Sequence, residues 1–309
     1  MFNTLSVTAS SVFEGFRLLQ AKTNRRLVIQ ENKVIIVSEP VARLGIDPVL
    51  AWFARSPKVS PQALIYIVRQ HTAKELLCFD PAAKRLPGQE LPISSQSVFK
   101  YDLTCYLQFW QFRQKLLDPA RDPFAPLIDY SREEGVYIQK GLAVFDGDRL
   151  AGGLTGQETQ TLGLLANQMR AGGMTFDLPP EKYGPGHRAS LRNAKGRTKI
   201  QVKIKQGQPF FIVKTEVTGA ISELVGERRS LSPLYSRQLE TEMARIIRRR
   251  EIALIQKMQS LHSDIINFGE QLRVQQYTWW KKHDWKKVFP TVSFAVQAKV
   301  HIVRDGVVR

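Results

Sequence analysis

The chain has 309 residues, 43% of them hydrophobic and 24% charged. This composition indicates a folded globular protein of two or three domains, and it excludes a disordered chain. No apolar run reaches the roughly 18–20 residues needed to span a bilayer, and the formal net charge of +17 favours anionic partners such as anionic lipid or nucleic acid.

The first part of the chain alternates between strand and helix patterns. Ser10 or Ser11 can cap a helix, and Thr72 can cap a shorter one, because a side-chain oxygen at this position accepts a free backbone N–H. Residues 80–95 are rich in proline, glycine and serine and predict a loop. We therefore expect strands at 5–9, 27–29, 34–37 and 63–68, and helices at 11–24, 41–55, 72–77 and 95–117.

The second part of the chain contains two hairpin patterns. In the first, Asp146-Gly147 would supply the positive φ angles of a tight turn in the stretch GLAVFDGDRL (141–150). In the second, Gly207 marks the turn between 199–205 and 210–217. Thr155 and Glu158 predict a capping box for a helix that extends to Met169.

The last hundred residues predict two helices and a final strand. Ser232-Pro233 begins the longer helix, with serine as the cap and proline in the first turn. A second helix is expected from Asp264 to about Lys282, followed by an alternating strand at 292–302. The apolar stripe of the longer helix comprises Leu239, Met243, Ile246, Ile247, Leu254, Met258 and Leu261.

These elements predict an α+β, multi-domain fold with mixed or antiparallel sheets packed against amphipathic helices. Two prolines in the segment DPARDP (118–123) interrupt the helix pattern and mark the domain boundary. We expect an N-terminal domain at 1–118, a linker at 119–136 and a C-terminal domain at 137–309.

The sequence gives little support to catalysis or cofactor binding. The five histidines are scattered without metal-ligand spacing, and the glycine-rich stretch at 151–156 lacks the lysine of a phosphate loop. A hydrolase using Glu158 or Asp264 remains an alternative, but Ser263 and Asp264 fit a surface helix cap better. Cys78 and Cys105 are expected to be buried apolar residues, and a disulfide between them is left open. We predict no catalytic, cofactor or metal residues.

The stretch TWWKKHDWKKVFP (278–290) concentrates three of the five tryptophans among four lysines. It has three interpretations: the end of a packed helix, a membrane or partner contact, and a nucleic-acid surface that stacks bases on Trp280 or Trp285. Packing is favoured, with Trp279 continuing the apolar stripe of its helix. Gly269 lies inside the same predicted helix, where glycine costs roughly 0.5–1 kcal/mol relative to alanine. A close approach of another segment would offset that cost.

Several motifs in the chain resemble those of one known family. The stretch SDIINFGEQL (263–272), followed by Trp279, Trp285, Phe289-Pro290 and the terminal strand, is similar to the C-terminal pattern of spore germination receptor C-subunits, the Ger(x)C family. The hairpin at 141–150 with Glu158-Thr159 also resembles that family. So do the segments SVFE (11–14) and VIIVSE (34–39), and Arg121-Asp122-Pro123 fits its interdomain link.

This resemblance implies a function in spore germination. It implies a non-enzymatic lipoprotein on the outer face of the inner spore membrane, which works with integral-membrane A and B subunits as a nutrient germinant receptor. It makes Phe268, Gly269, Glu270, Trp279 and Trp285 candidates for structural or partner contacts. The anionic membrane surface is a further expected partner, and no cofactor and no nucleic acid is expected. A basic nucleic-acid-binding protein is the alternative function.

The chain departs from the family at its start. Members carry a signal peptide ending in a lipidated cysteine, whereas this sequence begins MFNTLSVT, and its two cysteines lie too deep to serve. We therefore expect the first domain to be N-terminally truncated, and the full-length form to be lipid-anchored.

Overall fold

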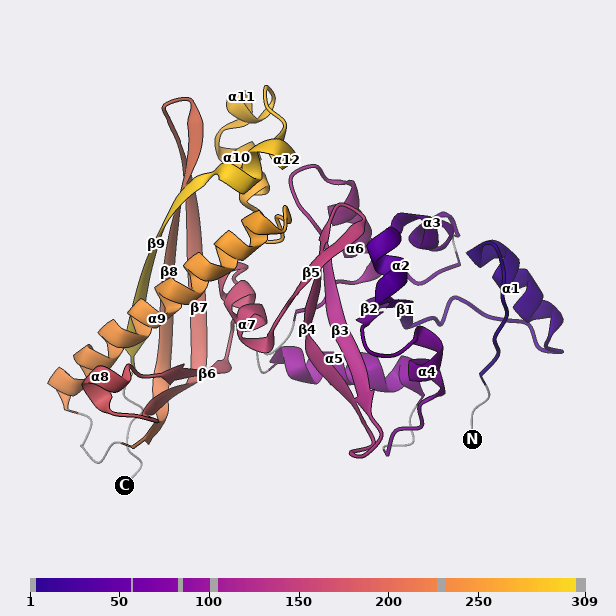
Figure 1. The fold of residues 1–309 in the computed structure, drawn as a ribbon, viewed down its shortest axis with the longest axis horizontal. Helices are drawn as coiled ribbons and strands as arrows, with labels where there is room; N and C mark the ends of the chain where they lie inside the picture. Colours follow the sequence, from indigo (N-terminus) through magenta and orange to yellow (C-terminus); the bar gives the residue numbers. More distant parts are fainter. Residues whose placement is uncertain (1–3, 57, 83–85, 101–104, 227–231, 304–309) are drawn as a thin grey trace. The chain divides into compact units, whose positions relative to one another are not determined.

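The computed structural model describes residues 4–56, 58–82, 86–100, 105–226 and 232–303, and its elements are labelled in Figure 1. The chain forms two compact units. Unit 1 comprises Met1–Ser97, Cys105–Asp118 and Asp122–Thr155, and unit 2 comprises Val98–Thr104, Pro119–Arg121 and Gly156–Arg309.

Unit 1 is built on a five-stranded mixed sheet in the order β1-β2-β3-β4-β5. The first three strands are parallel, and β3, β4 and β5 form an antiparallel meander. All five residues of β2 are buried, which explains its uninterrupted apolar sequence LIYIV. The strands are β1 Val34–Ser38, β2 Leu64–Val68, β3 Phe124–Ser131, β4 Val136–Asp146 and β5 Arg149–Leu154.

Short helices accompany this sheet. Two of the predicted caps are confirmed, because the hydroxyl of Ser11 accepts the N–H of Glu14, and Thr72 forms a full capping box with Glu75. The helices are α1 Val12–Ala21, α2 Glu39–Leu44, α3 Asp47–Arg55, α4 Ala73–Cys78, α5 Pro87–Lys100 and α6 Phe109–Leu117.

Three predicted elements near the start are wrong. Residues 5–9 and 27–29 form no strand, and Leu27 donates its N–H to the side chain of Gln20 instead of to a neighbouring strand. The helix expected at 41–55 is divided at Gly45, whose φ of +134° is not helical. The two predicted strands have no neighbouring strand to pair with in the described residues, and the predicted helix is interrupted by the non-helical backbone of Gly45.

The region 80–136 also differs from expectation. Helix α5 begins at Pro87, inside the expected loop, and the helix expected at 95–117 is interrupted because Phe109 donates its N–H to Ala63 of the chain next to β2. Strand β3 lies in the expected linker 119–136, yet it is the central strand of the sheet and pairs with both β2 and β4. The two compact units divide near residue 155, and the predicted domains at 1–118 and 137–309 stay a prediction.

Unit 2 contains a four-stranded sheet in the order β6-β7-β8-β9. Its centre is a hairpin of two 18-residue strands joined by Gln206 and Gly207, both with positive φ as a type I′ turn requires. The confirmed final strand β9 pairs in parallel with β8. The strands are β6 Gly172–Asp177, β7 Arg188–Lys205, β8 Gln208–Val225 and β9 Ser293–Ile302.

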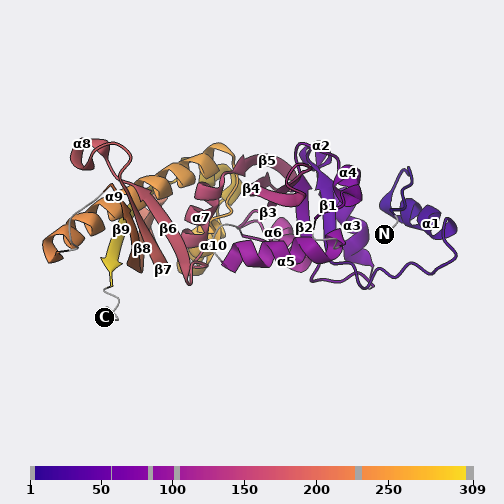
Figure 2. The ribbon, with the colours of Figure 1, turned by 90° about the horizontal axis from the view of Figure 1, so that it is seen from below.

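The 28-residue helix α9 covers one face of this sheet, as Figure 2 shows. Its predicted cap is confirmed, since the hydroxyl of Ser232 accepts the N–H of Tyr235. All but one of the predicted stripe residues are buried; Leu261 is half-buried. The helices of unit 2 are α7 Gly156–Leu165, α8 Pro180–Tyr183, α9 Pro233–Ser260, α10 Phe268–Gln275, α11 Tyr277–Trp280 and α12 Trp285–Val288, with a 3-10 turn η1 at Phe289–Thr291.

β6 pairs with residues 188–194 of β7, so the rest of β7 has a free edge on that side. Two side-chain amides form hydrogen bonds along this edge at residues 198–202. Asn167 donates to the carbonyl of Thr198 and accepts its N–H, at 2.9 and 2.6 Å. Gln275 does the same further along, donating to Ile200 and accepting from Val202, both at 2.9 Å. The edge is thus blocked against pairing with another chain.

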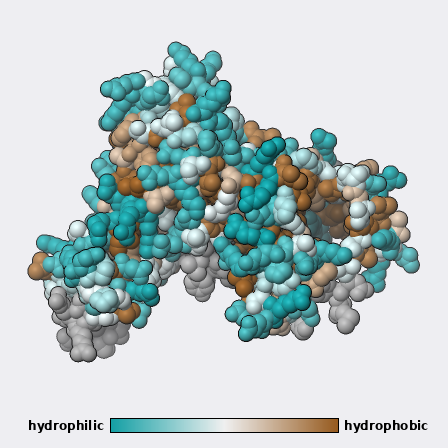
Figure 3. Space-filling view, viewed as in Figure 1, coloured by the Kyte–Doolittle hydropathy of each residue, from teal (hydrophilic) through white to brown (hydrophobic). Residues whose placement is uncertain are grey.

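The predicted α+β fold with mixed sheets is confirmed. Within the described residues, no helix has both the length and the apolar character needed to cross a bilayer. Hydrophilic residues dominate the surface over α9 in Figure 3.

Candidate functional site

Asp264 is the polar centre of the segment that follows α9. Its side chain is 1% exposed. One carboxylate oxygen accepts the N–H of Phe268 at 3.0 Å, and the other accepts the N–H of Gly269 at 2.7 Å and the indole N–H of Trp285 at 3.0 Å. The prediction of a surface cap is therefore wrong in one respect: Asp264 does cap α10, but from inside the core.

Gly269 lies at the closest approach in this cluster. A Cβ atom at this position would lie 2.4 Å from the indole nitrogen of Trp285 and 2.5 Å from the carbonyl oxygen of Ala120. Real Cβ atoms do not approach other heavy atoms so closely, so only glycine fits. The neighbouring Asn267 adopts a left-handed conformation, with φ 65°, and directs the chain into the helix.

Aromatic rings surround the same point. Phe268 stacks on Phe211 of β8 with ring centroids 4.3 Å apart, and Trp285 contacts both Phe211 and Phe289. Trp285 is 2% exposed, so its large ring belongs to the core of unit 2. We call Asp264, Phe268, Gly269, Trp285 and Phe211 the Asp264 cluster.

The other two candidates lie outside the cluster. Glu270 forms an ion pair with Arg273, whose guanidinium lies over the ring of Trp280. Trp279 donates its indole N–H to the carbonyl of Gly207 at 2.8 Å, at the tip of the β7–β8 hairpin, and its ring stacks on His283. The helix expected from Asp264 to Lys282 is divided at Gln276, between α10 and α11.

The Asp264 cluster is suited to holding a segment in place. The carboxylate of Asp264 is buried and accepts hydrogen bonds from three N–H groups. These hydrogen bonds replace those that the carboxylate would make with water. Among the described residues, no group of three or more histidine, cysteine or acidic side chains could hold a metal ion. The arrangement fixes α10 and α12 against β8.

A second buried acid lies in the centre of unit 2. Glu251 of α9 is fully buried and accepts the hydroxyl of Thr215 at 2.7 Å, and Thr215 in turn contacts the hydroxyl of Thr198 at 2.9 Å. Burial raises the pKa of Glu251 to about 7, and the hydrogen bond from Thr215 opposes that shift. Glu251 was not among the candidate residues predicted from the sequence. Nothing in the neighbouring sequence indicates that an acid next to an apolar helical stripe will be buried.

Glu158, the residue predicted to complete a capping box with Thr155, forms an ion pair with α9, and the capping box stays a prediction. Both of its carboxylate oxygens accept hydrogen bonds from the ammonium group of Lys257, at 2.8 Å each. This ion pair joins α7 to α9 beside a cavity of about 400 Å³, whose lining includes Arg249, Arg250 and Asp177.

Unit 1 contains a histidine–aspartate pair that the sequence did not reveal. His71 contacts the carboxylate of Asp129, which is 1% exposed, and stacks on Tyr130 with centroids 4.1 Å apart. Lys140 lies 3.8 Å from the same carboxylate. The two members are 58 residues apart in the chain, so only the fold brings them together. Cys78 is exposed, contrary to expectation, Cys105 is buried as predicted, and both are free thiols.

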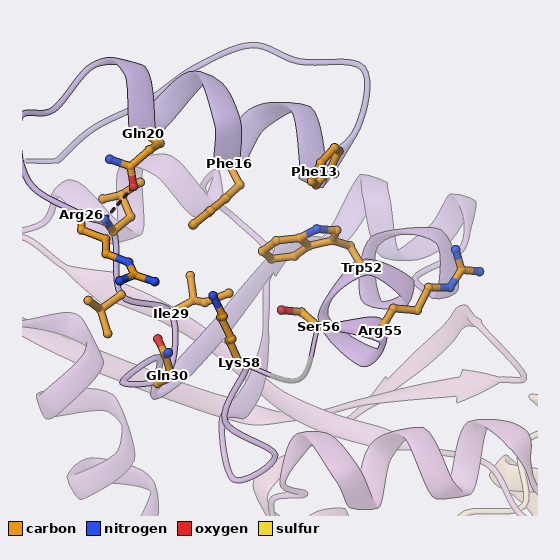
Figure 4. A pocket seen from close by; sticks show the side chains of 12 residues that line it. Phe13, Phe16, Gln20, Arg26, Ile29, Gln30, Trp52, Arg55, Ser56 and Lys58 are labelled. Atoms are coloured by element: carbon orange, nitrogen blue, oxygen red, sulfur yellow. Dashed lines mark hydrogen bonds between the residues drawn. The ribbon is translucent and has the colours of Figure 1, made fainter.

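A groove of about 570 Å³ lies between α1, α3 and residues 26–30 in unit 1 (Figure 4). Phe16 and Trp52 form its apolar side, with ring centroids 5.5 Å apart. Arg26, Arg55 and Lys58 supply positive charge, and the described residues that line it include no acid or histidine. The groove therefore lacks an acid–base pair.

Comparison with known families gives two matches that together cover most of the chain. A model described as "Spore germination B3/ GerAC like, C-terminal" matches residues 140–306. A model described as "Spore germination protein N-terminal domain" matches residues 2–130. The C-terminal match includes the whole Asp264 cluster.

Individual relatives come from Bacillus subtilis (strain 168). Spore germination protein B3 is 26% identical over 296 residues, covering 89% of this chain and 74% of the relative. Spore germination protein KC is 21% identical over 322 residues, covering 97% of this chain and 78% of the relative.

A solved structure shows the same fold. The crystal structure of the GerBC protein superimposes with a TM-score of 0.65, covering 88% of this chain and 79% of that protein. The sequence identity is 20%, so this match supports the fold.

Proposed function

Because this chain belongs to the spore germination B3/GerAC-like family, we propose that it is a non-enzymatic subunit of a nutrient germinant receptor required for spore germination. The observation that carries the proposal is the succession of both family domains along one chain, at 2–130 and 140–306. A fold shared over 88% of the chain with the GerBC protein supports it.

We propose that the subunit acts at the outer face of the inner spore membrane, lipid-anchored in its full-length form. Its partners would be the integral-membrane A and B receptor subunits and the anionic membrane surface. The net charge of +17 is consistent with an anionic surface as a partner. No cofactor is part of the proposal.

The candidate residues divide into two roles in this proposal. Phe268, Gly269 and Trp285 are buried and would hold the segment after α9 in one conformation. Glu270 and Trp279 are half-buried and would contribute to contact with a partner subunit. An ordered surface of this kind lowers the entropic cost of association.

Gene deletion and co-purification test the proposal. Spores that lack this gene should lose germination on the nutrient sensed by its receptor, and a wild-type copy should restore it. The tagged protein should co-purify with its A or B subunit from spore membranes. A deletion strain that germinates normally on every nutrient would refute the receptor role.

The alternative of a nucleic-acid-binding protein has weaker support. Base stacking needs exposed rings, and Trp285, one of the two tryptophans considered for it, is 2% exposed. Trp280 remains half-buried beside Arg273. Absence of a mobility shift with single- and double-stranded probes at low salt would exclude this alternative.

A further inference from the structure

The face of the unit 2 sheet opposite α9 is strongly basic. Side chains alternate across a strand, so alternate residues of β7, β8 and β9 share this face, and the strand register places them side by side. We call it the open face. Its cations are Lys195, Arg197, Lys199, Lys203, Lys205, Lys214 and Lys299, and all of them are exposed.

The opposing charge on the open face is small. Glu216 lies between Arg197 of β7 and Lys299 of β9 in the strand register. Among the open-face residues of the described segments 195–205, 208–218 and 293–301, Glu216 is the one acidic residue. Within the part of the chain that the structure describes, none of the seven cations forms an ion pair. The local excess of positive charge is therefore available to a partner.

The open face does not need a partner to complete the fold. Buried residues such as Val213, Val217 and Val300 point to the other side of the sheet, and two of them belong to the core beneath α9. The face itself carries polar residues, as expected for a sheet with one wet side. Its charge pattern is thus not dictated by packing.

We propose that the open face binds the anionic phospholipid headgroups of a membrane surface. Five of the seven cations lie on β7, where successive face positions are about 6.6–7 Å apart, and Lys214 and Lys299 lie on the next two strands, each about 4.8 Å further across the sheet. The result is a row of cations along β7 that widens onto β8 and β9, on the surface of a sheet and not in a groove. Such an array complements a membrane surface, where negative charge is spread over a plane.

The choice of cation favours a diffuse anionic surface over a site for one fixed anion. Six of the seven cations are lysines, which are hydrated point charges on flexible stems and do not require the fixed bidentate geometry that arginine prefers. Phe210, an aromatic ring on this face, is covered by the ammonium group of Lys205, 3.8 Å from its centroid. A stacking platform for single-stranded nucleic acid is therefore missing on this part of the sheet.

This inference rests on the proposed membrane location and adds the surface that would make the contact. A full-length lipoprotein would be held by its acyl chains, and the open face would orient unit 2 against the membrane. Each lysine or arginine near an anionic surface strengthens binding about fivefold. Several such side chains together would hold unit 2 in one orientation against the membrane even in a protein that is already anchored.

Vesicle sedimentation tests the proposal with the whole 309-residue chain. The face variant carries Lys199→Gln, Lys203→Gln, Lys214→Gln and Lys299→Gln. The matched control removes four exposed lysines elsewhere, with Lys58→Gln, Lys74→Gln, Lys281→Gln and Lys282→Gln. Both lose the same net charge, and the control also tests the tryptophan–lysine segment as a membrane contact.

We expect the wild type to bind phosphatidylcholine vesicles containing about one-third phosphatidylglycerol, and not pure phosphatidylcholine. The face variant should bind roughly several hundredfold more weakly, and the control less than about tenfold. Raising the salt from about 50 to about 500 mM should release the wild type. Unchanged binding of the face variant, or equal loss in both variants, would overturn the proposal.

A fluorescence measurement keeps the test independent of net charge. In a Cys78→Ser background, a polarity-sensitive dye is attached at Gln297→Cys on the open face or at Gln256→Cys on the exposed side of α9. Anionic vesicles should shift the emission of the dye at 297 and leave the dye at 256 unchanged. The reverse result, or tighter binding to polyglutamate or DNA than to vesicles, would contradict a lipid-binding face.

The two proposals can fail separately. If the deletion strain germinates normally but the open face binds vesicles as described, the receptor role fails and the lipid contact stands. If germination depends on the gene but the face variant binds vesicles like the wild type, only the lipid contact fails.

Discussion

At the scale of single residues, the Asp264 cluster shows how one buried charge organises a segment. A carboxylate inside a protein is costly unless its hydrogen bonds are made. Asp264 meets that requirement with two backbone N–H groups at the start of α10 and one indole N–H from α12. The helix start also favours negative charge. One side chain thereby joins two helices.

We predict that Asp264→Ala lowers the free energy of unfolding by about 3–5 kcal/mol, because three buried donors lose their acceptor. Asp284→Ala is the matched control: Asp284 also caps a helix, α12, but is exposed, so the loss should be about 0.5–1 kcal/mol. Urea denaturation measures both. Equal losses in the two variants would show that the buried network contributes nothing beyond capping.

We predict that Gly269→Ala is destabilising by about 1–3 kcal/mol, although alanine favours helices, because its Cβ has no space beside Trp285 and Ala120. Gly156→Ala, in the first turn of α7, serves as the control. Nothing lies within 4 Å of a Cβ there, so this change should be neutral or slightly stabilising. Thermal unfolding compares them, and a neutral Gly269→Ala would contradict the close approach.

We predict that Glu251 makes the protein less stable as the pH rises. Its pKa is raised from 4.5 to about 7 in the folded state, so the folded protein holds this proton after the unfolded chain has lost it. The contribution of Glu251 to the free energy of unfolding is therefore greatest below about pH 4.5. It decreases by about 3 kcal/mol in all between about pH 4.5 and pH 7.

Glu251→Gln should remove this pH dependence while keeping an acceptor for Thr215. Unfolding free energies of variant and wild type should therefore diverge between about pH 4.5 and 7, with the variant the more stable at neutral pH. Parallel pH profiles would show that the carboxyl titrates normally.

At the scale of elements, the long β7–β8 hairpin depends on protection of its edge. Asn167 and Gln275 each offer an amide that pairs with β7 as another strand would. Asn167 adopts a positive φ of 59°, which asparagine tolerates better than most residues. Its backbone conformation and its side-chain bonds therefore support the same contact.

We predict that Asn167→Ala lowers stability by about 1–3 kcal/mol, since it removes two hydrogen bonds and places alanine in a left-handed conformation. Asn167→Gly also removes the side-chain amide, but glycine adopts the positive φ without strain. The difference in stability between the two variants therefore gives the cost of the backbone strain alone. Hydrogen exchange at the N–H of Thr198 should quicken in both. Unchanged exchange there would refute edge protection by Asn167.

At the scale of the whole molecule, the proposed role requires an intact surface and no chemistry. We predict that Glu158→Gln restores germination to a deletion strain as fully as the wild-type gene. Its carboxylate forms an ion pair with Lys257 beside a cavity, and such a partly exposed pair contributes about 0–1 kcal/mol. The decrease in absorbance of spore suspensions after nutrient addition measures germination.

Asp264→Ala should fail to restore germination, through loss of folded protein. Immunoblots of spore extracts distinguish that outcome from loss of an activity. A folded, abundant Glu158→Gln protein that supports no germination would instead indicate a chemical role for this acid.

The class of fold, the hairpins, the family and three helix caps could be predicted from the sequence; the caps are Ser11, Thr72 and Ser232. These features depend on local spacing or on the hydroxyl of one residue, so neighbours in the chain suffice to specify them. The turn at 146–149 was predicted only in part: Gly147 has the expected positive φ, but Asp146 pairs with Arg149 and does not.

The remaining features depend on contacts between distant parts of the chain. That residues 5–9 form no strand, that β3 is central in a sheet, and that Asp264 lies in the core depend on partners far away in the chain. The open basic face likewise arises from the register of three strands whose members are up to about a hundred residues apart. Burial and pairing are properties of such distant contacts, and spacing along the chain does not encode which contacts form.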